Sequence, residues 1–348
     1  MPVEEVRNPT VTPTEASDTT ARPGLESLAM RWWAALDAAR SALHSAGPYI
    51  GAQQASAQTH ELAAERHEII QLLQGMAREQ RTASWLLRWL AAPSLTRRML
   101  GLPDGVVACV FDLDGVLTTS ATMHAVSWAE TFDPFLLERA ERSHREFVPF
   151  DPRTEYQVYL AGRPRLDGVR NFLGSRGIGL PEGADGDPPG TESMHGLANR
   201  KNQVLQGHLD RQGVAAFSGS RFYLEAARSI GVRRAVVSAS ANTAGILESA
   251  GLAHLIDYSV DGNTIAAEHL RAKPAPDTIV AACRELGVQP GQLAAFETTP
   301  AGITAARAAG VKLTVGVDRS GQTAALVAGD ADLVISDLAE LFEHDLAA

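Results

Sequence analysis

From residue 106 onward, short apolar runs alternate with segments of helical periodicity, and this alternation constrains the fold more than any other feature of the chain. The apolar runs have the length and composition of buried parallel strands: 106–111, 234–238, 292–297, 311–317 and 332–335. The helical segments lie between or before them: about 220–230, 241–250, 275–287 and 300–309. Repeating strand-then-helix units predict an α/β fold with a doubly wound parallel sheet.

A long segment between the first two runs breaks the alternation. Residues 121–215 are mostly helical in pattern, with a loop-like stretch, GADGDPPG, at 183–190. An insertion at this place predicts a helical cap domain on a core that is formed by residues 105–120 and 216–348.

The first hundred residues differ from the rest in composition. Residues 1–24 are rich in Pro, Thr, Glu and Ala, which predicts a disordered tail. Apolar residues then recur at helical spacing over 25–100, with stops at Gly47-Pro48 and Pro93, which predicts a helical extension. Four of the chain's five tryptophans lie there. Packing of these rings against the main domain or one another is the favoured interpretation, and a surface for self-association or a partner is the alternative.

The composition excludes several classes of protein. A net charge of −10 without a basic block argues against a nucleic-acid partner. Cys109 and Cys283 lie in apolar segments far apart, which predicts buried free thiols and neither a disulfide nor a zinc site. No apolar run approaches the ~18 residues of a membrane span, and the N-terminus lacks the apolar region of a secretory signal. We therefore expect a cytoplasmic protein with no membrane partner.

The first apolar run ends in two carboxylates. Asp112 and Asp114 follow Val106–Phe111 two positions apart, and Gly115 comes next. Because side chains alternate along a strand, both acids can face the same way at its carboxyl end, where open α/β sheets bind ligands. Mg²⁺ bound to carboxylate oxygens and to a substrate phosphate would relieve their mutual repulsion. A solvated Asp-Gly turn is the alternative interpretation.

Three further motifs follow FDLDGV at 111–116. They are VSAS at 237–240, KPAPD at 273–277 and FETTPAGITAARAAG at 296–310. In this order the four motifs resemble those of the haloacid dehalogenase superfamily of phosphotransferases, and within it the β-phosphoglucomutase branch. The resemblance covers about residues 105–345 and implies the superfamily's Rossmann-like core with an inserted cap.

The resemblance implies a set of catalytic residues. Asp112 is expected to be the nucleophile that holds the phosphoryl group as an aspartyl-phosphate, and Asp114 the general acid and base. Lys273 is expected to neutralise the charge of the nucleophile and of the transferring group. Ser238 ends a strand before a helix, where its hydroxyl and the following N–H groups suit a phosphate oxygen. On its own, such a serine is more often an N-cap.

The same resemblance implies substrate-binding residues. His124 matches the histidine that this branch carries beside its acid/base, Arg165 the cap arginine that grips the far phosphate, and Lys201 the cap lysine. A guanidinium and an ammonium suit a second, non-reacting phosphate, which a simple monophosphatase does not require. Ser240 and Asn242, in and beside the second motif, complete the predicted substrate contacts.

The fourth motif departs from the family pattern. Where the family usually has two acids at a strand end, this chain has Glu297 followed by Thr298. A hydroxyl is a neutral and weaker ligand than a carboxylate. We therefore expect Mg²⁺ to bind through Asp112, Asp114, Glu297 and, weakly, Thr298, with lowered affinity. A site that no longer functions is the alternative.

Together these features predict Mg²⁺-dependent phosphoryl transfer on a sugar phosphate. The resemblance implies interconversion of β-glucose 1-phosphate and glucose 6-phosphate through a 1,6-bisphosphate. A phosphatase for a sugar or polyol phosphate, with water as the acceptor, is one alternative. A binding or scaffold protein on a decayed enzyme fold is the other, suggested by Thr298 and by the helical extension, although the catalytic residues that remain argue against it.

Overall fold

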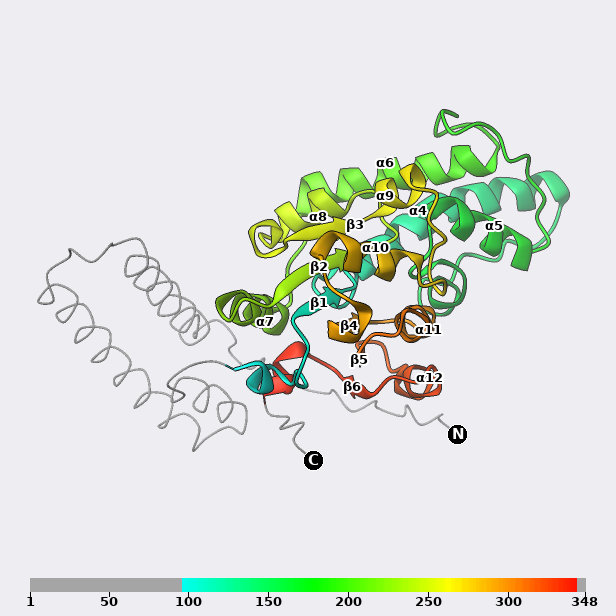
Figure 1. Cartoon of the computed structure of the whole chain (residues 1–348). Coiled ribbons are helices and arrows are strands. Elements are labelled where there is room, and N and C mark those ends of the chain that lie inside the picture. Colours follow the sequence, from blue (N-terminus) through cyan, green and yellow to red (C-terminus); the bar gives the residue numbers. More distant parts are fainter. Residues whose placement is uncertain (1–95, 343–348) are drawn as a thin grey trace, which may run out of the picture. The chain divides into compact units, whose positions relative to one another are not determined.

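The computed structural model describes residues 96–342, which form an α/β core and a helical cap (Figure 1). The predicted tail at 1–24 and the predicted helical extension up to residue 95 lie outside the described residues. The described part begins with a short 3-10 helix, η2 (Arg97–Leu100). None of the helices within this part is long and apolar enough to cross a membrane.

A six-stranded parallel sheet forms the core, as predicted. Its strands, in sheet order, are β3 (Tyr258–Val260), β2 (Arg233–Val237), β1 (Ala108–Phe111), β4 (Leu293–Glu297), β5 (Leu313–Val317) and β6 (Leu333–Ile335). All except β3 coincide with the predicted runs. The prediction omits β3 because this edge strand has three residues, two of them only half-buried, and forms no apolar run.

Helices cover both faces of this sheet (Figure 1). The core helices are α7 (Ser218–Ser229), α8 (Thr243–Ser249), α9 (Gly262–Ala267), α10 (Asp277–Leu286), α11 (Pro300–Ala309) and α12 (Thr323–Ala328). Three 3-10 turns complete the core: η4 (Ala253–Leu255), η5 (Pro290–Gln292) and η6 (Leu338–Phe342). The predicted helices correspond to α7, α8, α10 and α11, and Gly287 and Gly310 end the last two in the left-handed conformation.

The chain reverses its direction of winding at β1. From β1 it proceeds outward through β2 and β3, and then returns to the other side of β1 and continues through β4, β5 and β6. Phe111, the last residue of β1, is in register with Val236 on one side and Phe296 on the other. The Asp112 N–H donates to the Phe296 carbonyl at 2.9 Å. Such a reversal opens a crevice at the carboxyl ends of the strands, which is where ligands bind.

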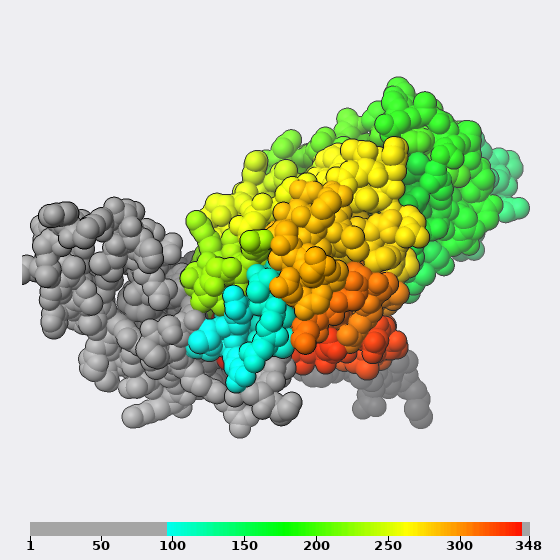
Figure 2. All heavy atoms as spheres, viewed as in Figure 1, coloured from blue at the N-terminus to red at the C-terminus, as the bar shows by residue number. Residues whose placement is uncertain are grey.

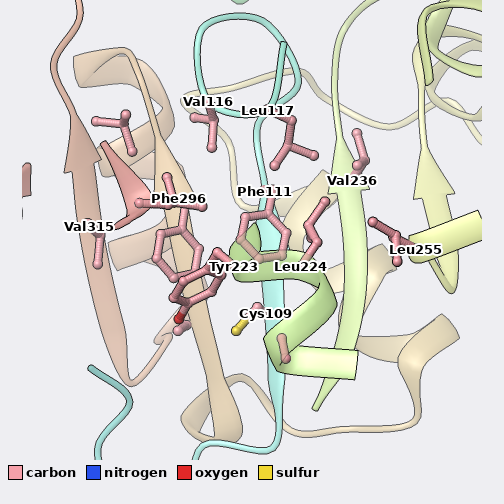
Figure 3. Packing of buried hydrophobic residues seen from close by; sticks show 14 of the residues in the cluster. Cys109, Phe111, Val116, Leu117, Tyr223, Leu224, Val236, Leu255, Phe296 and Val315 are labelled. Carbon is pink, nitrogen blue, oxygen red and sulfur yellow. The ribbon is translucent and has the colours of Figure 1, made fainter. Parts of the chain in front are cut away.

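Alternate residues of β1 enter two apolar clusters, one on each face of the sheet. Helix α7 covers one cluster, and α10 and α11 cover the other. Aromatic rings fill the first (Figure 3): Phe111 stacks on Phe296 with 4.8 Å between ring centroids, and Tyr223 of α7 packs edge-on against both. Cys109 and Cys283 are buried free thiols. Burial on both faces explains why the central strands are continuous apolar runs.

The residues between β1 and α7 form the cap. Its helices are α4 (Ser120–Ser143), the single π-helical turn η3 (Tyr156–Leu160), α5 (Arg165–Ser175) and α6 (Met194–Gln212). They enclose an apolar cluster of their own, the cap cluster, whose aromatic members are Trp128, Phe132, Phe135, Phe150, Tyr156 and Phe172. In the space-filling view the green cap lies against the yellow residues of the core (Figure 2), and Asn242 of the core donates to Asn202 of α6 at 2.8 Å.

Two linkers connect the cap to the core and run side by side. The first lies between β1 and α4, and the second lies between α6 and α7. The Thr119 N–H donates to the Ala215 carbonyl at 2.9 Å, and the Phe217 N–H donates to the Leu117 carbonyl at 3.0 Å. The first linker also carries Asp114. The placement of this acid is therefore coupled to the placement of the cap.

Candidate active site

Asp112 directly follows β1 and is 5% exposed. One carboxylate oxygen accepts a hydrogen bond from the Leu113 N–H at 3.0 Å and lies 3.5 Å from the Lys273 Nζ. The other accepts from the Thr298 hydroxyl at 3.0 Å. Burial raises the pKa of Asp112, and the positive charge of Lys273 acts in the opposite direction. A carboxylate with an adjacent ammonium can attack phosphorus as the anion.

Asp114 contacts the first turns of α4 instead. The Ser120 hydroxyl donates to Asp114 Oδ1, and His124 Nε2 lies 3.7 Å from the same oxygen. Burial raises the pKa of Asp114, against the effect of the hydrogen bond from Ser120. A raised pKa favours the protonated form, which a general acid requires, whereas at Asp112 the Lys273 ammonium 3.5 Å away favours the anion. The two acids thus lie in different surroundings, as two different catalytic roles require.

Lys273 lies between Asp112 and Glu297, the last residue of β4. Its Nζ is 2.7 Å from Glu297 Oε2 and donates to the Val237 carbonyl at 3.2 Å. Burial lowers the pKa of Lys273, but the charges of Asp112 and Glu297 raise it overall, so the side chain stays an ammonium. Burial raises the pKa of Glu297 to about 7. Glu297 Oε1 has no hydrogen-bond partner among the described residues.

Ser238 follows β2, the strand next to β1, and is buried. Its hydroxyl accepts from the Ser240 N–H at 3.1 Å, and the Ser240 hydroxyl accepts from the Asn242 N–H at 3.2 Å. Both serines line the cavity between core and cap. Asn242 is not among its lining residues, because its side chain is bonded to Asn202 of α6. The structure places Asn242 at the contact between core and cap.

Lys201 of α6 is buried in the cap beside His124. Its Nζ is 2.8 Å from His124 Nδ1 and 5.3 Å from the ring centroid of Trp128. Burial lowers the pKa of Lys201 to about 7, although the charge of Asp114 opposes this shift. Burial also lowers the pKa of His124 well below its usual range, so the imidazole is neutral. If Nδ1 accepts from the Lys201 ammonium, Nε2 carries the ring proton; Nε2 has no hydrogen-bond partner within the described residues and lies 3.7 Å from Asp114 Oδ1.

A cavity of about 1080 Å³ brings most of the predicted site residues together. Those that line it are Asp112, Asp114, His124, Arg165, Lys201, Ser238, Ser240 and Thr298. Arg165 opens α5 and contributes an Nη1 that has no hydrogen-bond partner in the described part of the chain. Lys273 and Glu297 lie behind Asp112 and do not line the cavity. Asp112 and Asp114 therefore face the cavity from the core, and Arg165 and Lys201 face it from the cap.

Thr298 lies between two of the groups that are predicted to bind Mg²⁺. Its hydroxyl oxygen is 3.0 Å from Asp112 Oδ2 and 3.4 Å from the Asp114 carbonyl oxygen. Three oxygens thus converge, and Mg²⁺ prefers oxygen ligands, commonly one or two carboxylates together with a substrate phosphate. The donors fit this ion, but with a single carboxylate. Glu297 is paired with Lys273, and no group of three His, Cys, Asp or Glu within the described residues could hold a metal.

Several residues at the site carry no signal in the predicted motifs, and Ser120, Tyr156 and Arg319 are examples. Ser120 begins α4 and bonds to the predicted acid/base, so a helix start shortly after that acid could have indicated it. Tyr156 lines the cavity from the cap. Arg319 donates to the Gly115 carbonyl at 3.1 Å and stacks over Phe217 at 3.6 Å, so it contacts both linkers. No local pattern indicates the last two, because they reach the site from distant parts of the chain.

The region that forms the site is similar to known proteins. A family model described as haloacid dehalogenase-like hydrolase matches residues 106–310. The β-phosphoglucomutase of Mycobacterium bovis is 47% identical over 252 residues, which cover 72% of this chain and 96% of that protein. The validoxylamine A 7′-phosphate phosphatase of Streptomyces hygroscopicus is 28% identical over 241 residues, 67% of this chain and 94% of that protein. A solved β-phosphoglucomutase of Clostridium difficile shares the fold, with a TM-score of 0.53 at 24% identity over 68% of this chain and 93% of its own.

Proposed function

The chain belongs to the haloacid dehalogenase-like hydrolase family, and on that premise we propose that it catalyses phosphoryl transfer on a sugar phosphate. The proposed reaction is that of a β-phosphoglucomutase, which interconverts β-glucose 1-phosphate and glucose 6-phosphate. The observation that carries the proposal is the cavity, where Asp112 and Asp114 face Arg165 and Lys201. The carboxylates suit the reacting phosphate, and the cap cations suit a second one.

The reaction proceeds in two halves. First, an Asp112 carboxylate oxygen forms a bond to phosphorus while the bond from phosphorus to the donor sugar oxygen breaks, and Asp114 gives its proton to that oxygen. Then Asp114 takes the proton of a hydroxyl on the acceptor sugar, whose oxygen attacks phosphorus, and the bond to Asp112 breaks. Lys273 stays protonated throughout and offsets the negative charge of Asp112.

Other groups of the chain orient and neutralise the phosphoryl group. The Ser238 hydroxyl lines the cavity beside the strand end that carries Asp112 and is positioned for a phosphoryl oxygen. Mg²⁺, when bound through Asp112, the Asp114 carbonyl and the Thr298 hydroxyl, would supply further positive charge to the phosphoryl oxygens. Closure of the cap excludes water, so that the aspartyl-phosphate meets a sugar hydroxyl.

Phosphorus NMR of the purified protein with Mg²⁺, a bisphosphate primer and each anomer of glucose 1-phosphate tests this proposal. We expect the β anomer to be converted into glucose 6-phosphate. In Asp112→Asn we expect neither product nor phosphoenzyme, because an amide is a far weaker nucleophile than a carboxylate. Turnover by Asp112→Asn would contradict the assigned nucleophile.

A phosphatase for a sugar or polyol phosphate is the second candidate. The same residues serve it, with water as the acceptor, and the similarity to a phosphatase over 94% of that protein's length supports it. Release of inorganic phosphate without isomerisation in the NMR series would decide for it. A decayed site, the alternative that Thr298 motivates, would hydrolyse no chromogenic aryl phosphate in the presence of Mg²⁺. A cytoplasmic location and the absence of nucleic-acid and membrane partners stay predictions.

A further inference from the structure

Two side chains that line the cavity have a buried polar atom without a hydrogen-bond partner in residues 96–342. They are His124 and Arg165, both predicted to bind substrate. A further lining residue is Tyr156 of η3, which is 7% exposed and lies in the wall of the same cavity as Asp112 and Asp114. Neither the motifs nor the proposed mechanism gives its phenol a role.

The hydroxyl of Tyr156 differs from that of Tyr223 in its surroundings. Tyr223 is fully buried in the core, and its hydroxyl donates to the Leu100 carbonyl at 2.9 Å. Buried phenols normally find such a partner, because leaving one unpaired costs free energy. Tyr156 has its ring in the cap cluster, and its side chain lines the cavity, with no hydrogen bond from its hydroxyl to another group within residues 96–342. The partner is therefore expected to be a molecule that enters the cavity.

The charges around Tyr156 define what that partner can be. After burial, the carboxylates of Asp114 and then Asp112 are the groups that raise the pKa of the phenol well above its usual range. The phenol therefore stays protonated and acts as a neutral hydrogen-bond donor. A neutral donor near two carboxylates suits an uncharged oxygen such as a sugar hydroxyl. Phosphate groups are better served by the cap cations Arg165 and Lys201.

We propose that Tyr156 is a substrate-binding residue whose hydroxyl donates a hydrogen bond to a ring hydroxyl of the sugar held between core and cap. This inference rests on the proposed function, since it names a contact of the same site. Because the ring is packed in the cap cluster, the hydroxyl is positioned by the cap and not by the sheet. Recognition of the sugar by Tyr156 therefore depends on the packing of the cap.

The proposal is tested by comparing the wild-type protein with two single variants, Tyr156→Phe and Tyr159→Phe. Tyr156→Phe keeps the ring and removes only the hydroxyl. Tyr159 lies on the same η3 turn and packs partly buried against the cap cluster, but it does not line the cavity, so its variant is the matched control. For each protein, kcat/KM is measured with β-glucose 1-phosphate and with its 2-, 3- and 4-deoxy analogues, and hydrolysis of an aryl phosphate is measured in parallel.

We expect Tyr156→Phe to lower kcat/KM for the glucose phosphate roughly 3- to 10-fold, the effect of one neutral hydrogen bond. With the deoxy analogue that lacks the contacted hydroxyl, wild type and variant should be equal. Aryl phosphate hydrolysis and the control variant should be unchanged.

The proposal is overturned if Tyr156→Phe matches wild type on every sugar phosphate, or if the loss persists with all three deoxy analogues. It is also overturned if aryl phosphate hydrolysis or Tyr159→Phe shows the same loss. Failure of the proposed function is seen separately, because wild type would then convert no sugar phosphate.

Discussion

A neutral side chain at position 298 reduces the negative charge that is available to a metal ion. The Thr298 hydroxyl donates to Asp112 and faces the Asp114 carbonyl. We expect Thr298→Asp to bind Mg²⁺ roughly tenfold more tightly, because the affinity of a hard cation rises with the charge of its ligands. Isothermal titration calorimetry without substrate measures this affinity directly. Thr298→Asn, which stays neutral, is the control, and equal affinities of the Asp variant and wild type would refute the idea.

Lys201 titrates near neutral pH, which predicts a pH dependence of activity. Burial holds its pKa at about 7, against an ordinary 10.5. The ammonium is therefore present below that pKa and lost above it, so kcat/KM for a sugar phosphate should fall as the pH rises through about 7. Lys201→Met should lack this fall and be about 10- to 100-fold less active at low pH, the effect of a lost charged hydrogen bond. A steady-state pH profile measures both effects.

The lowered pKa of Lys201 also predicts that the stability of the fold depends on pH. Between the folded pKa of about 7 and the ordinary value of 10.5, the unfolded chain holds a proton at Lys201 that the folded chain has released. The free energy of unfolding therefore rises with pH across this window, and burying Lys201 lowers stability in neutral solution. Urea unfolding at neutral pH should show Lys201→Met to be more stable than wild type. Lys312→Met, at an exposed lysine, should change neither the pH profile nor the stability. A pH profile of Lys201→Met that keeps the fall would assign it to another group.

The sequence predicts those site residues that directly follow a strand. Asp112 and Ser238 come at the ends of buried apolar runs, and parallel strands bring such ends together. The pairing of Lys273 with Glu297 joins two motifs, and only the register of the sheet shows that they meet. Tyr156 has no such signal, because its place in the cavity depends on how the cap packs.

Among the secondary-structure elements, the strands that are buried on both sides are the ones that the sequence predicts most directly. β1, β2, β4 and β5 each contain a buried apolar run, because helices cover both faces of the sheet. The short elements β3, α9 and α12 are missing from the prediction, because three to six residues at an edge have no periodicity to detect. The helical character of the cap was predicted, but its π-helical turn η3 was not.

The cap and the core lie in one compact unit of the chain but bury separate apolar clusters. The cap cluster is distinct from the two clusters of the sheet, and paired linkers join the two parts. Asp112 and Asp114, the proposed reacting carboxylates, follow β1, whereas Arg165, Lys201 and Tyr156 belong to the cap. In the proposed mechanism the chemical step therefore belongs to the core, and selection of the acceptor to the cap.

This division predicts that a mutation which destabilises the cap will impair isomerisation more than phosphoryl transfer at Asp112. Phe172 is fully buried in the cap cluster, with its ring centroid 4.1 Å from that of Phe132. Phe172→Ala should destabilise the cap by about 3–5 kcal/mol, the usual cost of deleting a buried phenylalanine ring. Isomerisation of a sugar phosphate should then fall strongly, because the cap groups are no longer held in place. Hydrolysis of an aryl phosphate, measured on the same preparation, should fall much less, because a phenolate leaving group needs little protonation by Asp114. Leu224→Ala, in the buried face of α7, is the control and should reduce both activities in parallel. A parallel loss in Phe172→Ala would show that the cap does not select the acceptor.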